Sequence, residues 1–151
     1  MQIGIESIDS PDVQALLMAH LESMHQYSPV ESIHALTTAQ LGDPSITLWC
    51  AREEQALLGC GALKMLDEFH GEIKSMRTAP EHLRKGIAQA LLEVIIQAAR
   101  ERSLVRVSLE TGSHEAFRPA RELYMKNGFC VCGPFPPYLE DPYSVFMSLK
   151  L

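Results

Sequence analysis

The sequence lacks long apolar runs. No stretch approaches the roughly 18 apolar residues that a membrane-spanning helix needs. The first residues, Met-Gln-Ile-Gly-Ile-Glu, also lack the basic and apolar regions of a signal peptide. We therefore expect a cytoplasmic protein with no membrane partner. The chain shows no internal repeat and no low-complexity linker, and one domain over residues 1–151 is the simplest organisation for this length.

Basic residues are also scarce. Lys and Arg number 13 against 19 Asp and Glu, which gives a formal net charge of −6. A protein that neutralises nucleic-acid phosphates usually has a basic excess, so we expect no nucleic-acid partner. The acidic balance mildly favours cationic substrates instead.

Metal and redox motifs are missing as well. The cysteines form no Cys-x-x-Cys pair, which is the spacing of zinc and redox sites. His20 and His25 are five residues apart, and this spacing does not place two side chains on one helical face. We expect no bound metal, and we expect buried, reduced thiols at Cys50, Cys60, Cys130 and Cys132.

The first half of the chain changes from helical to strand-like periodicity. Residues 2–8 alternate as in a strand, and Asp9-Ser10-Pro11 supplies a cap and a first-turn proline for a helix. A second helix is expected from about 31 to 41. After it, apolar alternation predicts an antiparallel meander of strands over 46–52, 57–66 and 72–78.

The second half alternates helices with strands. Apolar residues recur on one face of residues 85–102, a strand is expected from 105 to 109, and a helix over 114–127 ends at Gly128. A strand-helix-strand crossover normally pairs its strands in parallel. With final strands over 129–132 and 143–149, we expect an α/β (α+β) fold: a mixed, mostly antiparallel sheet of about six or seven strands flanked by about four helices.

Residues 76–92 pass from a strand through a short basic loop into an apolar-striped helix. The first-turn N–H groups of that helix and the positive end of its dipole point toward one place. Gly86 and Ala88 let backbone amides approach a phosphate, while Arg84 and Lys85 add positive charge. The turn predicts a site for a phosphate-bearing ligand, although it matches neither a P-loop nor a dinucleotide fingerprint.

Two segments resemble the GNAT superfamily of acetyl-CoA-dependent N-acetyltransferases. Residues 79–88, Ala-Pro-Glu-His-Leu-Arg-Lys-Gly-Ile-Ala, are similar to its pyrophosphate motif, Gln/Arg-x-x-Gly-x-Gly/Ala. Residues 120–129, Ala-Arg-Glu-Leu-Tyr-Met-Lys-Asn-Gly-Phe, are similar to its Ala-x-x-Leu-Tyr-x-x-x-Gly-Phe segment. The resemblance covers nearly the whole chain. It departs at Leu83, where the family usually has Gln or Arg, and at Phe117, where many members have Asn.

The resemblance implies an acyltransferase that uses acetyl-CoA as co-substrate and lets an amine attack the thioester directly in a ternary complex. The strand before the turn is implied to hold the pantetheine arm and to place a backbone N–H on the thioester oxygen. The implied cofactor-binding residues are Met76, Arg77, Thr78, Leu83, Arg84, Lys85, Gly86, Ile87, Ala88, Gln89, Phe117, Ala120 and Tyr124.

An alkyl amine is almost entirely protonated at neutral pH, so a base near the acceptor helps the reaction. Glu72, Glu110 and His70 are the candidate bases, with the two glutamates at strand ends and His70 in a polar turn. Tyr124 matches the family's general acid, which protonates the departing thiolate. The resembled fold implies an acceptor pocket that includes His25, Tyr27, Glu31, Tyr138, Glu140 and Asp141.

Three functions stay open at this point. The first is an N-acetyltransferase that acts on the primary amine of a small molecule or peptide. The second is a non-catalytic acyl-CoA-binding or sensor module, and the third is a binder of another phosphorylated ligand. The sequence does not decide whether the chain forms a homodimer.

Overall fold

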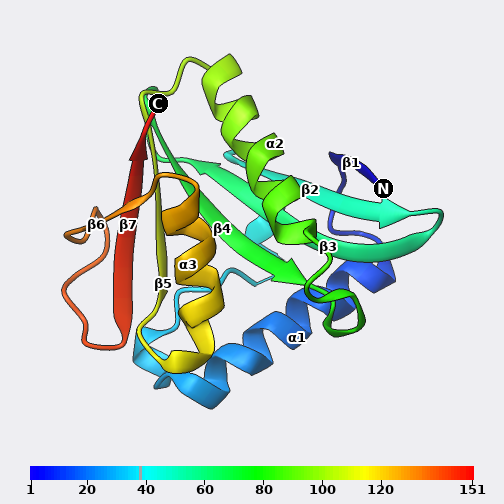
Figure 1. The fold of residues 1–151 in the computed structure, drawn as a ribbon, viewed down its shortest axis with the longest axis horizontal. Coiled ribbons are helices and arrows are strands. Elements are labelled where there is room, and N and C mark those ends of the chain that lie inside the picture. The colour runs from blue at the N-terminus through cyan, green and yellow to red at the C-terminus, as the bar shows by residue number, and fades with distance from the viewer. Residues whose placement is uncertain (38) are drawn as a thin grey trace.

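The computed structural model describes residues 1–37 and 39–151. Seven strands form one sheet in the order β1-β2-β3-β4-β5-β7-β6 (Figure 1). Only β4 and β5 run parallel, and every other neighbouring pair is antiparallel. The expected mixed sheet is confirmed, with strands β1 Gln2–Ile5, β2 Ile46–Glu53, β3 Ala56–Met65, β4 His70–Thr78, β5 Arg106–Gly112, β6 Cys130–Cys132 and β7 Ser144–Lys150.

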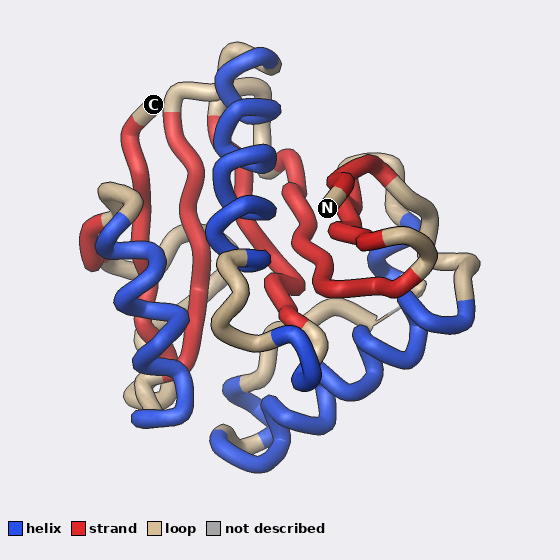
Figure 2. The backbone as a smooth tube through the Cα atoms, turned by 45° about the vertical axis from the view of Figure 1, so that its right-hand side comes forward, coloured by secondary structure: helices blue, strands red, loops and turns tan. Residues whose placement is uncertain are grey.

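Helices cover both faces of the sheet. The α-helices in the described ranges are α1 Pro11–Tyr27, α2 Ile87–Glu101 and α3 Arg118–Lys126, joined by 3₁₀ turns at Val30–Ser32, Gln40–Gly42, Pro80–His82 and Glu115–Phe117. Figure 2 shows α2 and α3 standing along one side of the strands, while α1 runs below them. The alternation of β2 explains this layering, because Trp49 packs in the cluster with α2 and Leu48 packs in the cluster with α1.

The prediction of a helix over residues 31–41 is wrong. The described residues contain three α-helices instead of the expected four or so. Residues 33–37 have no regular structure, and Thr38 lies outside the described residues. Ile33 and Thr37 are β-branched, which weakens helix formation. The His34 ring instead packs edge-on against Tyr138, with 4.8 Å between ring centroids. Tertiary contact therefore overrides the weak helical pattern.

The expectation of four buried, reduced cysteines is correct for two of them. All four thiols are free, and Cys50 and Cys60 are buried. Cys130 is exposed and Cys132 is half-buried, because both lie on β6, the strand at the edge of the sheet. Within the described ranges, no helix combines the length and apolarity needed to cross a membrane.

Two irregularities of β4 shape the middle of the molecule. Its parallel pairing with β5 is limited to three residue pairs and ends at Glu72 opposite Ser108, so the two strands separate beyond this point. Its register with β3 shifts where Ser75 and Met76 lie opposite Gly61, and Ser75 has a φ of 57°. A bulge of this kind leaves a residue out of the ladder and bends the strand. Both features turn backbone and side chains of β4 toward the gap beside β5.

Candidate active site

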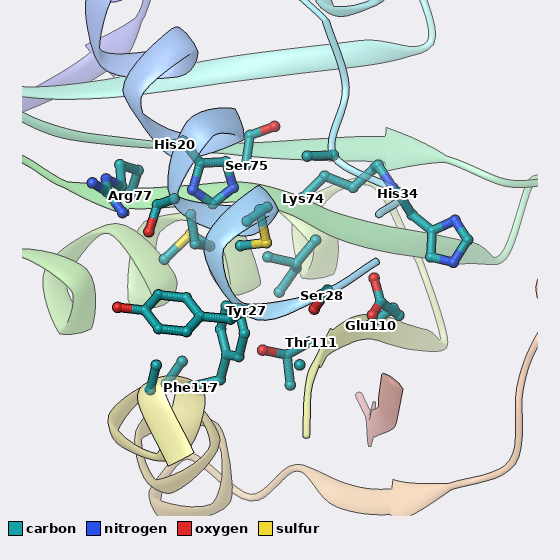
Figure 3. Close-up of a pocket in the computed structure, with 18 of the residues that line it drawn as sticks. His20, Tyr27, Ser28, His34, Lys74, Ser75, Arg77, Glu110, Thr111 and Phe117 are labelled. Carbon is teal, nitrogen blue, oxygen red and sulfur yellow. The ribbon is translucent and has the colours of Figure 1, made fainter. Parts of the chain in front are cut away.

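A cavity of about 450 Å³ lies where β4 and β5 separate (Figure 3). This volume is in the usual range for small-molecule sites. Its walls come from α1, residues 32–35, the second half of β4, the end of β5, the first turn of α2 and helix α3. The elements that carry both recognised motifs therefore meet at one cavity.

The turn before α2 exposes backbone donors at one edge of this cavity. The first hydrogen bond of the helix runs from Ala90 N to Gly86 O, so the amides of residues 87–89 have no partner within the helix. Arg84 and Gly86 have positive φ values of 62° and 79°, which fold the loop tightly around the helix end. Leu83 and Ala88 line the cavity, whereas Arg84, Lys85 and Gly86 are exposed beside it. This arrangement can hold an anionic group.

The other two residues of that turn have structural contacts. Ile87 is buried in the core beneath α2. Gln89 exchanges two side-chain hydrogen bonds of 2.8 Å with Asn127 at the end of α3. The amide pair fixes α3 relative to the first turn of α2, and so fixes Tyr124 relative to the anion-binding edge.

Tyr124 reaches the cavity from α3. The residue is buried, and its ring packs against Phe129 with 5.7 Å between centroids. Burial raises the pKa of Tyr124 well above its ordinary value, so the phenol stays protonated at neutral pH. Its hydroxyl forms no hydrogen bond to another described residue, although the residue lines the cavity. The group is a protonated donor available to a ligand.

Phe117 contributes an apolar wall. Its ring meets Tyr27 edge-on at 5.9 Å, and a Cβ added at Gly112 would come within 2.1 Å of it. Both aromatic residues line the cavity, as do Met76, Arg77, Thr78 and Ala120. The departure from the usual Asn thus places an aromatic packing contact at this position.

The two candidate glutamates have different environments. Glu72 is 2% exposed, and its Oε2 atom lies 3.0 Å from Lys74 Nζ. Tyr138 Oη donates to the same oxygen at 2.5 Å and accepts from Lys74 Nζ at 2.7 Å. Glu110 forms no ion pair in the described structure, and burial raises its pKa to about 7. A carboxyl with this pKa can exchange a proton at neutral pH.

His70 lies outside the cavity lining. Its Nε2 atom is 2.6 Å from Ser108 Oγ, and its ring packs against Phe135. Burial lowers the pKa of His70. The ring is therefore an internal hydrogen-bond partner of β5.

The described residues contain no cluster of three or more His, Cys, Asp or Glu side chains able to hold a metal ion.

Residues 12–129, more than half of the chain, match the family model described as Acetyltransferase (GNAT) family. The chain belongs to the GNAT family of acetyltransferases.

Several GNAT relatives match nearly the whole chain. An uncharacterized N-acetyltransferase of Bacillus subtilis, YsnE, is 54% identical over 151 residues and covers 100% of both chains. A protein of Azospirillum brasilense named IAA acetyltransferase is 38% identical, with 95% of each chain covered. The crystal structure of a putative acyl-CoA N-acyltransferase from Klebsiella pneumoniae has a TM-score of 0.81 at 28% identity, covering 99% of this chain and 97% of the other. This GNAT protein is therefore an acyltransferase.

The GNAT cavity brings together most, but not all, of the residues predicted from the sequence. Of the predicted acceptor residues, Tyr27 lines the cavity and Tyr138 bonds to Glu72 and Lys74 in its wall. Asp141 lies half-buried beside Ser32, whose hydroxyl helps to lower the pKa of that carboxyl. His25, Glu31 and Glu140 are exposed and are not lining residues.

Several lining residues of the GNAT cavity were not predicted. Lys74 could have been found, because residues i and i+2 of a strand share a face and Glu72 was already a candidate. His20 on α1 is half-buried, its Nδ1 atom is buried with no partner among the described residues, and desolvation lowers its pKa to about 4. No local signal distinguishes such a histidine from one in the core. The other unpredicted polar lining residues are Ser23, Ser28, Ser32, His34, Ser75 and Thr111.

Proposed function

We propose that this GNAT protein transfers an acetyl group from acetyl-CoA to a primary amine of a small molecule or peptide. The amine attacks the thioester directly while donor and acceptor are both bound. The observation that carries the proposal is a single cavity that joins three groups: the free amides at the start of α2, the protonated Tyr124 phenol and the Glu110 carboxyl with its pKa near 7.

The turn before α2 fits the pyrophosphate of acetyl-CoA. The amides of residues 87–89 have no helical partner, and Arg84 and Lys85 stand beside them. Because backbone N–H groups supply most of the contacts in such a turn, Leu83 does not weaken it. The bulge at Ser75 and Met76 supports backbone binding of the thioester as well. An amide that lies outside the strand ladder is free to donate a hydrogen bond to the thioester oxygen.

Glu110 is the better base of the two glutamates. Glu72 is already engaged by Lys74 and Tyr138 and is closed to solvent. Glu110 lines the cavity without such a partner, and a pKa near the working pH favours both proton uptake and proton release. Glu110 accepts a proton from the amine, directly or through one water, as the N–C bond forms.

Tyr124 completes the proton balance. The departing sulfur needs a proton as the C–S bond breaks, and the buried phenol can donate one. Burial makes the phenol a weaker acid, but the same desolvation raises the proton affinity of a neighbouring thiolate. None of the cysteines is among the described lining residues, which supports direct attack over an acetyl-enzyme intermediate.

An acceptor screen that measures release of the CoA thiol tests this function. The panel should contain alkyl amines, amino acids, peptides and IAA, for which the Azospirillum relative is named. We expect thiol release with at least one amine and its loss in Glu110→Gln. Binding of acetyl-CoA without thiol release from any acceptor would contradict the proposal and support the non-catalytic module. Competition by simple nucleotides in place of acetyl-CoA would favour a different phosphorylated ligand.

A further inference from the structure

We infer that Lys74 selects acceptors that carry a carboxylate next to the reacting amine, as amino acids do. The inference rests on the proposed acetyl transfer to an amine and names the class of acceptor. It follows from the unused bonding capacity of a buried ammonium group, from its register with Glu110, and from the rigid wall that holds it.

Lys74 has one donor more than its protein partners use. The ammonium group carries three N–H donors. Among the described residues its acceptors are Glu72 Oε2 at 3.0 Å and Tyr138 Oη at 2.7 Å. The side chain is only 9% exposed and the residue lines the cavity. The third donor is thus left for a cavity ligand, and an anionic oxygen is the partner that a buried ammonium favours most.

Lys74 and Glu110 face each other across the opening between their strands. The parallel ladder ends with Glu72 opposite Ser108, so Lys74 and Glu110 are the next positions on the same face. The strands have separated there, and no Lys74–Glu110 ion pair forms in the described structure. Both residues line the cavity, and Figure 3 shows their side chains at the same end of it. A ligand with an amine beside a carboxylate can span this gap, with the amine toward Glu110.

The wall behind Lys74 is held in place before a ligand arrives. Tyr138 bonds to both Glu72 and Lys74, and its ring contacts Phe135, Phe146 and His34. A side chain fixed in this way loses little further freedom on binding. A purely cationic acceptor, in contrast, would bring a like charge to Lys74. This local charge opposes the cationic preference that the net charge of the chain suggests.

Steady-state kinetics with matched acceptors test the inference. The pairs are phenylalanine against 2-phenylethylamine and lysine against cadaverine, which differ only in the α-carboxylate. In wild type we expect KM to be about tenfold lower or better for the carboxylate member, the effect of one charge-assisted hydrogen bond. Binding of N-acetylphenylalanine and N-(2-phenylethyl)acetamide to the CoA-loaded protein gives the same comparison without turnover.

Two variants separate selection from folding. Glu72→Gln keeps a hydrogen-bond acceptor for Lys74 but removes the carboxylate that neutralises its ammonium charge. The ammonium should then attract an acceptor carboxylate more strongly, so KM for the carboxylate acceptors should fall further. Lys74→Met combined with Glu72→Gln leaves no unpaired buried charge and should abolish the preference while KM for acetyl-CoA stays within about twofold. Lys150→Met, at an exposed position on β7, is the matched control.

The outcomes distinguish the two proposals. A preference for the carboxylate-free members, or a preference that survives in the double variant, overturns the role of Lys74 and leaves acetyl transfer intact. Use of other amines but of no member of either pair also overturns it. If no amine releases thiol, the proposed function fails, and the two acetylated ligands still decide the role of Lys74: equal binding overturns it, and tighter binding of N-acetylphenylalanine supports it.

Discussion

Replacing Glu110 by Gln should change the pH dependence of stability, and this effect can be measured before any acceptor is known. Burial holds the pKa of Glu110 at about 7, against 4.5 for an ordinary glutamate. The folded protein therefore keeps a proton that the unfolded chain releases between these two values. Under this condition the free energy of unfolding falls as pH rises. Gln removes the titration and keeps the shape of the side chain.

The magnitude follows from the two pKa values. One pH unit between the folded and unfolded pKa corresponds to about 1.4 kcal/mol. The interval from 4.5 to about 7 therefore corresponds to about 3 kcal/mol at Glu110. Below pH 4.5 the carboxyl is protonated in both states and costs nothing. Above pH 7 the full cost of burying the carboxylate is present, and the Gln variant should be more stable than wild type by that amount relative to acidic pH.

Urea unfolding of wild type and Glu110→Gln at intervals from pH 4.5 to 8.5 measures the difference. Subtracting the two curves cancels the titration of all other groups that behave alike in both proteins. Glu140→Gln is the control, because that side chain is exposed in the loop before β7 and its difference should stay flat with pH. A flat difference for Glu110→Gln as well would refute the raised pKa of this buried carboxyl and with it the assignment of Glu110 as base.

Three further predictions concern turnover and cofactor binding. With any accepted amine, wild-type kcat/KM should rise with pH through about 7, because Glu110 must lose its proton to act as a base, and Glu110→Gln should lower kcat/KM about 100-fold at pH 7.5 and remove this step. Tyr124→Phe should lower kcat about 100-fold while KM for acetyl-CoA stays within about twofold, and unchanged turnover from pH 6 to 9 would exclude the phenol as the acid. Gly86→Ala should cost about 1 kcal/mol and raise KM for acetyl-CoA, since its φ is 79° and a Cβ there meets no atom within 4 Å, so only backbone strain acts. Gly4→Ala, where a Cβ also meets nothing and φ is ordinary, should leave KM for acetyl-CoA unchanged.

The fold was largely predictable because its signals are local and strong. Residues 87–101 show an apolar face with helical spacing, and β2 alternates between the two cores, so both elements follow from the sequence alone. The segment 33–37 was mispredicted because its conformation depends on the contact of His34 with Tyr138, which is more than 100 residues away in the chain. Local propensity carries no information about such a partner.

The parts of the candidate site formed by the backbone of one continuous segment were predictable from the sequence. The parts formed by side chains far apart in the sequence were not. The anion-binding turn is a property of residues 83–89 in order, and the motif locates it directly. The environment of Glu72 is different, since Tyr138 reaches it from a loop 66 residues later. The sequence predicted Glu72 as a candidate base at a strand end, whereas the structure buries it in a network with Lys74 and Tyr138.

The end of the β4–β5 ladder sets the roles of the two glutamates. Glu72 occupies the last position of β4 that pairs with β5, so neighbouring strands enclose it, and the Lys74 ammonium and the Tyr138 hydroxyl compensate its burial. Glu110 lies two residues beyond Ser108, where β5 still pairs with β7 but no longer with β4, and it lines the cavity. Like residues in unlike environments acquire different proton affinities and different functions. Moving the last strand pair by two residues would enclose Glu110 with Lys74 instead, and the cavity would lose both its base and its free ammonium donor.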